Sequence, residues 1–265
     1  MNGFRALFLK EVRRFFKVSL QTIAAPVLTS LLYLLIFAHV VGGMGGVGGM
    51  GENPNAAVGS GGANLSYSAF LVPGLVIMSI LQNAFANPSS SLIQAKGTGS
   101  IVFVLLAPIS PLTFFAAYVL AAVVRGIAVG LCCLIASLAL VIPTIMHPIT
   151  ALVFAMLGAA LLGVLGLLAG IWAEKYEQMA AFQNFIILPL TMLSGIFYSI
   201  QSLPPLWQAI SRFNPFFYMI DGFRYGFFGV ADFSPLTSLA VTLGCLAGLS
   251  ALVLFLLHRG WKLRY

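Results

Sequence analysis

Six long apolar runs, separated by shorter segments that are polar or rich in glycine and proline, dominate the hydrophobic pattern of the chain. They cover approximately residues 23–41, 69–93, 114–142, 149–172, 180–200 and 236–257. An α-helix needs about 20 apolar residues to cross a hydrocarbon layer of about 30 Å, and each run is close to or above this length. The pattern therefore predicts an all-α membrane protein with six transmembrane helices.

Residues 1–22 show a different pattern, in which aromatic and aliphatic side chains recur at near-helical spacing among basic ones. This pattern predicts an amphipathic helix in the membrane interface, with the aromatic face among the lipid headgroups and the cations toward water. A basic end that only orients the first span explains the same residues, and a docking surface for a cytoplasmic partner is compatible with both. The cations are Arg5, Lys10, Arg13, Arg14 and Lys17.

Residues 194–231 are strongly apolar and aromatic, yet their prolines exclude one continuous span. Pro204 and Pro205 suit the first turn of a short helix, Asn214 and Pro215 end it, and a second short helix follows. Broken backbone at membrane depth is stable only where protein buries it or where it lines a cavity. We therefore predict a re-entrant helical hairpin on the outer face, between spans five and six. The alternative is an aromatic belt without a gating role.

Two spacings within this segment, which we delimit as 201–230, indicate specific contacts. Asp221 and Arg224 are three residues apart, so they share a helix face and can pair. Trp207, Ile210 and Phe213 form an apolar stripe on the first short helix. The candidate gate residues are Leu203, Pro204, Pro205, Trp207, Ile210, Phe213, Asn214, Pro215, Asp221, Arg224 and Tyr225.

The segment 94–113, between the second and third runs, is too apolar for a free loop and too short for a span. Gly97 and Gly99 indicate a turn, a short apolar helix follows, and Pro108 and Pro111 end it. Such a helix fits a groove on a partner protein, and the alternative is a helix that lies flat on the membrane. The residues concerned are Lys96, Gly97, Thr98, Gly99, Ser100, Ile101, Phe103, Leu105, Leu106 and Pro108.

The composition agrees with a membrane protein and leaves no room for a separate soluble domain. Of the 265 residues, 60% are hydrophobic and 7% are charged, against about 25% charged residues in a soluble domain. We therefore treat 1–265 as one membrane domain. The net charge of +7 comes mainly from the two ends of the chain and from Lys96 and Lys175. By the positive-inside rule both termini are predicted to be cytoplasmic, and this distribution argues against binding of nucleic acid.

Motifs for catalysis and metal binding are missing from the sequence. No G-x-x-x-x-G-K-[ST] motif occurs, so no P-loop is expected, and the histidines and cysteines form no metal-binding pattern. None of the six acidic residues lies in the middle of a predicted span, which argues against a proton-coupled carrier. Arg125 is the one charge within a span. It either snorkels or pairs with a carboxylate as a structural residue, or it contacts an anionic headgroup of a substrate.

Three segments resemble a known family: YSAFLVPGLVIM at 67–78, KGTGSIVFVLLAPISP at 96–111, and LSGIFYSIQSLPPLWQAISRFNPFFYMIDGFRYGF from Leu193 onward. Together they resemble the ABC-2 type permeases of bacterial ABC transporters, in particular the YadH-like and NodJ-like inner-membrane permeases. The resemblance runs in order through nearly the whole chain. The glycine-rich insertion at 42–62 departs from it.

The resemblance implies a six-span subunit that forms a homodimer and binds two copies of a separate ATPase on its cytoplasmic face. In that family the N-terminal helix and the loop after span two, here 96–107, contact the ATPase, and the hairpin after span five, here 203–228, is the external gate. ATP and Mg²⁺ would be bound by the partner, and this chain would hold no cofactor and no catalytic residue. The implied function is export of an amphipathic lipid, glycolipid or drug-like substrate through the bacterial inner membrane. An ATPase-independent channel or carrier is the alternative.

Overall fold

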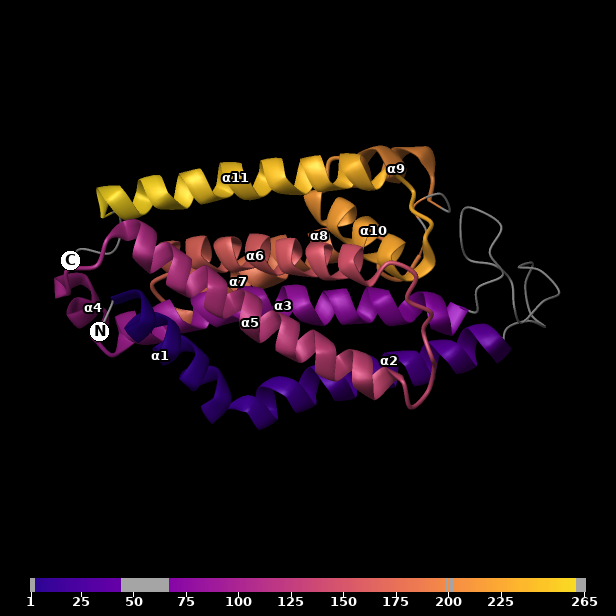
Figure 1. Ribbon diagram of the computed structural model, residues 1–265, viewed down its shortest axis with the longest axis horizontal. Coiled ribbons are helices and arrows are strands. Elements are labelled where there is room, and N and C mark those ends of the chain that lie inside the picture. Colours follow the sequence, from indigo (N-terminus) through magenta and orange to yellow (C-terminus); the bar gives the residue numbers. More distant parts are fainter. Residues whose placement is uncertain (1–2, 44–66, 199, 201–202, 261–265) are drawn as a thin grey trace.

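A computed structural model describes residues 3–43, 67–198, 200 and 203–260. In this part of the chain every regular element is a helix. The longest helices run side by side along one axis (Figure 1). The predicted all-α architecture is confirmed for the described residues, while the glycine-rich insertion lies almost entirely outside them.

The limits of most helices agree with those expected from the hydrophobic pattern. In chain order the elements are α1 (Gly3–Lys17), α2 (Ser19–Gly43), α3 (Tyr67–Gly97), α4 (Ile101–Leu106), α5 (Pro111–Ser137), α6 (Pro148–Trp172), α7 (Tyr176–Phe182), η2 (Gln183–Ile187), α8 (Leu188–Met192), α9 (Pro205–Arg212), α10 (Pro215–Phe228) and α11 (Pro235–Arg259). Among the described residues, five helices have the length and hydropathy of a membrane span: α2, α3, α5, α6 and α11.

The predicted fifth span, 180–200, does not form one long helix. Instead α7 continues into η2, a stretch of π-helix, and then into α8, and the helical run ends at Met192. Pro189 has no N–H to donate to the carbonyl of Phe185, four residues earlier, which explains why regular α-helical bonding fails there. Residues 176–192 would extend about 26 Å as a regular helix, slightly less than a hydrocarbon layer of about 30 Å. The count of six spans therefore stays a prediction.

Several helices begin where a proline follows a side chain that caps the backbone. The hydroxyl of Ser110 accepts a hydrogen bond of 3.2 Å from the N–H of Thr113 at the start of α5. The hydroxyl of Ser234 accepts one of 3.3 Å from the N–H of Thr237 at the start of α11. Capping satisfies an N–H that has no partner within the helix, and proline is suited to the first turn. The prolines in the loops therefore set where these helices begin.

The centre of the bundle is α3, which packs between α5 and α6. Its side chains Leu71, Ile77 and Leu81 are fully buried. Close packing here depends on small residues: a Cβ atom at Gly166 of α6 would overlap the carbonyl oxygen of Phe85 in α3. By contrast α2 and α11 remain mostly exposed, as expected for helices whose outward faces meet lipid or a partner.

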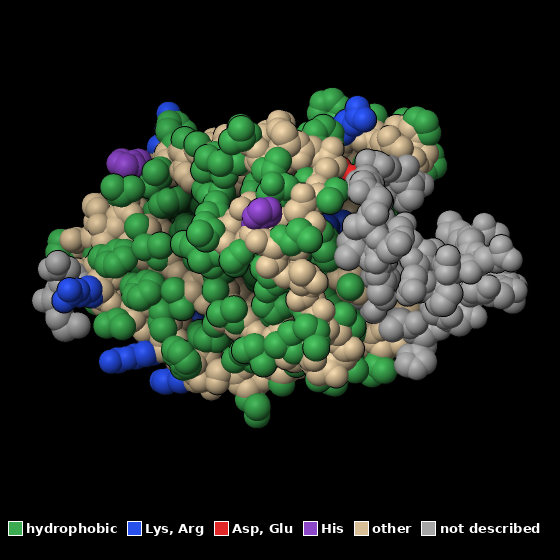
Figure 2. All heavy atoms as spheres, turned by 45° about the vertical axis from the view of Figure 1, so that its right-hand side comes forward, with side chains coloured by type: hydrophobic (Ala, Val, Ile, Leu, Met, Phe, Trp, Pro, Cys, Tyr) green, Lys and Arg blue, Asp and Glu red, His purple; other side chains and the backbone are tan. Residues whose placement is uncertain are grey.

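Different helices lie at the two ends of the bundle. One end holds α1, α4 and the C-terminal end of α11, and the opposite end holds α9 and the start of α11 (Figure 1). The helical run 176–192 leads from the first end toward the second. On the face seen in Figure 2, hydrophobic side chains cover most of the described surface, and the visible Lys and Arg side chains lie mainly toward the ends. This distribution is typical of a protein embedded in a bilayer.

Candidate functional site

The predicted short helix after the second span is present as α4, directly after a turn at Gly99 with φ of 69°. Ile101 faces inward and is buried, whereas Phe103 and Leu106 are each 77% exposed. The helix ends at Leu106, just before Ala107 and Pro108. The structure thus confirms a short helix with an outward apolar face, and its role in docking stays a prediction.

Lys96, expected among the residues that contact a partner, bonds to another helix of the same chain, and its contact with a partner stays a prediction. Its ammonium group donates hydrogen bonds of 2.6 Å to the carbonyl oxygen of Ile171 and 2.9 Å to that of Ala173. These carbonyls lie at the C-terminal end of α6, where backbone acceptors lack helical partners and the helix dipole favours a cation. Lys96 therefore joins α3 to α6 at the base of α4.

The N-terminal helix α1 turns its apolar face toward the protein. Leu7, Glu11 and Phe15 are four residues apart and are all buried, with Phe15 only 3% exposed. The prediction that the aromatic face lies among lipid headgroups is therefore wrong for Phe15, because α1 packs against α5. The neighbouring Phe16 remains 64% exposed. Only the outer face of α1 is available to lipid or to a partner.

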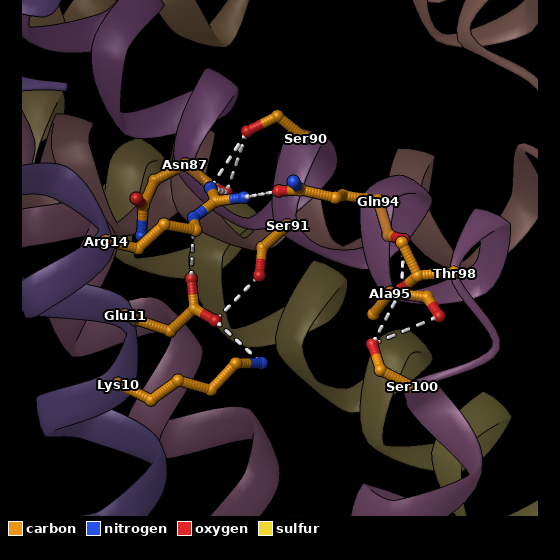
Figure 3. Close-up of polar contacts among 10 residues, drawn as sticks. All are labelled: Lys10, Glu11, Arg14, Asn87, Ser90, Ser91, Gln94, Ala95, Thr98 and Ser100. Carbon is orange, nitrogen blue, oxygen red and sulfur yellow. Dashed lines mark hydrogen bonds and ion pairs between the residues drawn. The ribbon is translucent and has the colours of Figure 1, made fainter. Parts of the chain in front are cut away.

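A buried ionic network joins α1 to the last third of α3 (Figure 3). The carboxylate of Glu11, fully buried, accepts a hydrogen bond of 2.6 Å from the hydroxyl of Ser91. Arg14 Nε lies 3.7 Å from one carboxylate oxygen and Lys10 Nζ lies 3.4 Å from the other. A buried carboxylate requires such partners to remain charged.

Arg14 extends this network onto α3 by three further contacts. Its guanidinium donates to the carbonyl oxygen of Asn87 at 2.8 Å and to the hydroxyl of Ser90 at 2.9 Å, and lies 3.4 Å from Gln94 Oε1 (Figure 3). The sequence interpretation missed this network. Two signals point to it: Glu11 shares a helix face with Leu7 and Phe15, and the second apolar run ends in a series of Asn, Ser and Gln residues.

Arg125, the one charge within a predicted span, contacts side chains of two other helices. Its Nη2 atom lies 3.4 Å from Asn83 Oδ1 of α3, and its guanidinium lies 5.9 Å from the ring centroid of Phe15 in α1. An amide and an aromatic face, rather than the expected carboxylate, are thus its immediate partners. These contacts support a structural role, which stays a prediction.

The hairpin after the broken fifth span consists of α9 and α10, with the chain reversing at Asn214. Asn214 Oδ1 accepts from the N–H of Phe216 at 3.0 Å, and its Nδ2 donates to the carbonyl oxygen of Leu190 at 2.6 Å. The hydroxyl of Ser211 donates to the carbonyl oxygen of Leu193 at 3.1 Å. Side chains of the hairpin therefore occupy the backbone acceptors at the end of α8.

The two hairpin helices differ in how firmly they are held. Most side chains of α10 are buried, and Gly226 lies against Ala151 of α6 with no room for a Cβ atom. On α9 the apolar stripe faces outward: Trp207 is 45% exposed and Ile210 is 42% exposed, and Phe213 just after the helix is 89% exposed. With few buried contacts, α9 is the part of the hairpin best suited to move.

Asp221 and Arg224, predicted to pair, bind different loops. The carboxylate of Asp221 accepts from the N–H groups of Asp232 at 2.8 Å and Phe233 at 3.1 Å. Arg224 donates to the carbonyl oxygen of Ile196 at 2.7 Å. Burial raises the pKa of Asp221 to about 6, against the lowering effect of its two backbone hydrogen bonds. The carboxylate of Asp221 thus anchors the loop between α10 and α11.

Residues of the kind that hold metal ions are not gathered in the described part of the chain. It contains no group of three or more His, Cys, Asp or Glu side chains that could bind an ion. The candidate site instead has two parts: the exposed helix α4 at one end, with polar contacts to neighbouring helices, and the hairpin of α9 and α10 at the other, in which α9 is largely exposed.

Comparisons with known proteins place the chain in a family of membrane transporters. Residues 2–228 match the family model described as ABC-2 type transporter. The chain is 35% identical over 260 residues to the inner membrane transport permease YadH of Escherichia coli K12, which covers 98% of this chain and 96% of the relative. YadH of Shigella flexneri gives the same identity and coverage.

Proposed function

Because the chain belongs to the ABC-2 type transporter family, as a multi-pass transport permease of the inner membrane, we propose that it is the membrane subunit of an exporter driven by a separate ATPase. This chain would carry no ATPase site of its own. ATP and Mg²⁺ would be bound and used by the partner subunit.

The observation that carries this proposal is the exposed apolar face of α4. Phe103 and Leu106 each leave most of their surface uncovered, and burying such side chains is worth about 1.5–3 kcal/mol each. The helix lies at the same end of the bundle as the cationic helix α1. We assign this end to the cytoplasm by the positive-inside rule. A groove on a cytoplasmic ATPase would cover this face.

Hydrogen bonds near α4 could transmit a displacement of this helix to the rest of the bundle. α4 follows α3 after a three-residue connection, Lys96 joins α3 to the end of α6, and Arg14 joins α3 to α1. A displacement of α4 by the ATPase would therefore reach three helices through direct bonds. Coupling of this kind needs elements with two arrangements, and the broken run 176–192 with its attached hairpin is the candidate.

The remaining parts of the proposal concern topology and assembly. We place the helical run 176–192 as a short fifth span, which gives six spans with both termini in the cytoplasm. Two copies of the chain would form a homodimer that binds two ATPase subunits. The hairpin of α9 and α10 would be re-entrant and close the outer exit, and the substrate would be an amphipathic lipid, glycolipid or drug-like molecule.

The proposal can be tested with a candidate ABC ATPase subunit from the same organism. We expect the two proteins to co-purify, and the double variant F103A/L106A to bind the ATPase at least about tenfold more weakly, since loss of one interface anchor costs about 2 kcal/mol. The control is Leu206→Ala, because Leu206 is 69% exposed on α9, at the opposite end. Co-purification that is unchanged in F103A/L106A would contradict the assignment of α4.

Liposomes distinguish the exporter from a channel or carrier. With both subunits present, a fluorescent short-chain phospholipid should move across the bilayer only when ATP is supplied. Movement at the same rate with the purified membrane subunit alone would overturn the ATPase-driven mechanism.

A further inference from the structure

A concave cavity of about 190 Å³ opens on the side of the bundle between α5 and α6. Its floor includes Ile80 of α3 and Phe223 of α10, which are both buried. Its rim includes Leu131 of α5 and Leu152 of α6, each 52% exposed. We call this cavity the α5/α6 groove.

The α5/α6 groove is lined by apolar side chains and by the backbone of one glycine. No polar or charged side chain contributes to its lining. A cavity of about 150 Å³ lined by Leu, Ile and Phe stays free of water and binds benzene or xenon. A groove of larger volume and similar lining therefore favours an apolar ligand over water.

The surroundings of the groove indicate which kind of apolar ligand it would bind. α5 and α6 both have the length and hydropathy of membrane spans, and next to the groove Ile135 is 65% exposed and Val153 is 40% exposed. Such side chains face lipid. A partner helix is about 10–12 Å across, so it cannot enter a space of this size, whereas a hydrocarbon chain is slender and flexible.

One end of the groove reaches the loop that precedes α6, where Ile145 and Pro148 contribute to the lining. Between them, the ring of His147 stacks on that of Tyr225, with ring centroids 5.2 Å apart. The backbone N–H of His147 donates a hydrogen bond to the carbonyl oxygen of Gly226. Aromatic rings with polar atoms are typical of the depth of lipid headgroups. We propose that the groove binds one acyl chain of a bilayer phospholipid, with its headgroup beside His147 and Tyr225.

The experiment uses the full-length protein in nanodiscs that contain a phosphatidylethanolamine with a diazirine on one acyl chain. After illumination, cross-linked peptides are identified by mass spectrometry. Labels should concentrate on 127–134 and 145–155. Leu131→Trp places a larger side chain at the mouth of the groove and should lower this labelling at least fivefold. The control is Ile135→Trp, one helical turn away and outside the lining, which should label like the unchanged protein.

Thermal unfolding shows whether each variant is folded. If Leu131→Trp is not, Leu152→Trp closes the opposite rim and tests the same prediction. Labels spread evenly over all exposed faces of α5, or equal labelling in the groove and control variants, would overturn the proposal. So would efficient cross-linking between Leu131→Cys residues of two copies, because a second copy would then cover the groove.

Discussion

The side-chain amide of Asn214 donates a hydrogen bond of 2.6 Å to the carbonyl oxygen of Leu190, at the end of the broken fifth helical run. The oxygen of the same amide accepts from the N–H of Phe216 and caps α10. One side chain therefore starts the second helix of the hairpin and holds it against α8. The break predicted at Asn214 and Pro215 thus has a defined bond that motion of the hairpin would have to break.

Two substitutions separate these tasks of Asn214. Asn214→Asp keeps a cap but loses the donor to Leu190, which leaves a carbonyl without its partner and should lower the free energy of unfolding by about 1–3 kcal/mol. Asn214→Ala also loses the cap, at a further cost of about 1 kcal/mol. Thermal unfolding in detergent checks the order, and hydrogen exchange should rise in 203–213 for both variants. Equal stability of all three proteins would show that the bond is not made in solution.

The attachment of α1 to α3 depends on Arg14. Arg14→Met removes the hydrogen bonds of Arg14 to Asn87 and Ser90. It also removes one of the cations that offset the negative charge of the buried Glu11 carboxylate. Breaking a buried ion pair costs about 3–5 kcal/mol, so a large fall in unfolding temperature is expected. Arg13→Met is the matched control, since Arg13 is exposed and no hydrogen bond or ion pair joins it to another described residue. Its stability should change by less than about 0.5 kcal/mol, and a similar loss in both variants would point to a general effect of charge.

Lys96 provides the bond between α3 and the end of α6. Lys96→Met leaves the carbonyls of Ile171 and Ala173 without this donor and should destabilise the protein by about 2 kcal/mol. If the bond also transmits motion, ATP-driven transport should fall further than ATPase binding does. Lys175→Met, in the exposed connection after α6, is the control. Transport and binding that fall in parallel would limit Lys96 to a structural role.

The carboxyl group of Asp221 should make stability depend on pH. Its pKa of about 6 in the folded protein lies above its usual value near 3.8, so the folded state holds the proton more tightly than the unfolded state. The resulting contribution is complete below about pH 4 and is lost as the pH rises through 6. At about 1.4 kcal/mol for each pKa unit, it is on the order of 2–3 kcal/mol.

The measurement is the unfolding temperature of the protein and of Asp221→Asn between pH 4 and 8. The two curves should diverge as the pH rises from about 4 to 6 and run parallel above that range, because the asparagine does not ionise, while other titrating groups affect both proteins alike. Curves that are parallel between pH 4 and 6 would contradict the raised pKa.

Local features of the sequence account well for the elements. Apolar length predicts α2, α3, α5, α6 and α11, and Asn214 with Pro215 predicts the boundary between α9 and α10. The structure adds that Ser followed by Pro marks where α5 and α11 begin. The fifth span is the exception. Mean hydropathy over 180–200 is insensitive to the missing N–H of Pro189, so composition suggested a continuous helix where the backbone forms a π-helical stretch and ends early.

The partners of the polar side chains could not be predicted in the same way. Ser91 is 80 residues from Glu11, and Ile171 is 75 residues from Lys96. Lys96 and Glu11 carry charges that a linear interpretation assigns to water or to a partner protein. Packing of the helices instead buries Glu11 completely and Lys96 in part, and both groups find partners within the bundle.

The sequence by itself determined that the chain is helical, lies in a membrane and resembles one transporter family, because apolar length, proline position and motif order are properties of neighbouring residues. Only the tertiary structure decided that Glu11 and Arg14 bind α3, that Lys96 bonds α6, and that Asn214 holds the hairpin to α8. The physical reason is that these bonds join residues 24 to 80 positions apart, and they form only once the helices have packed.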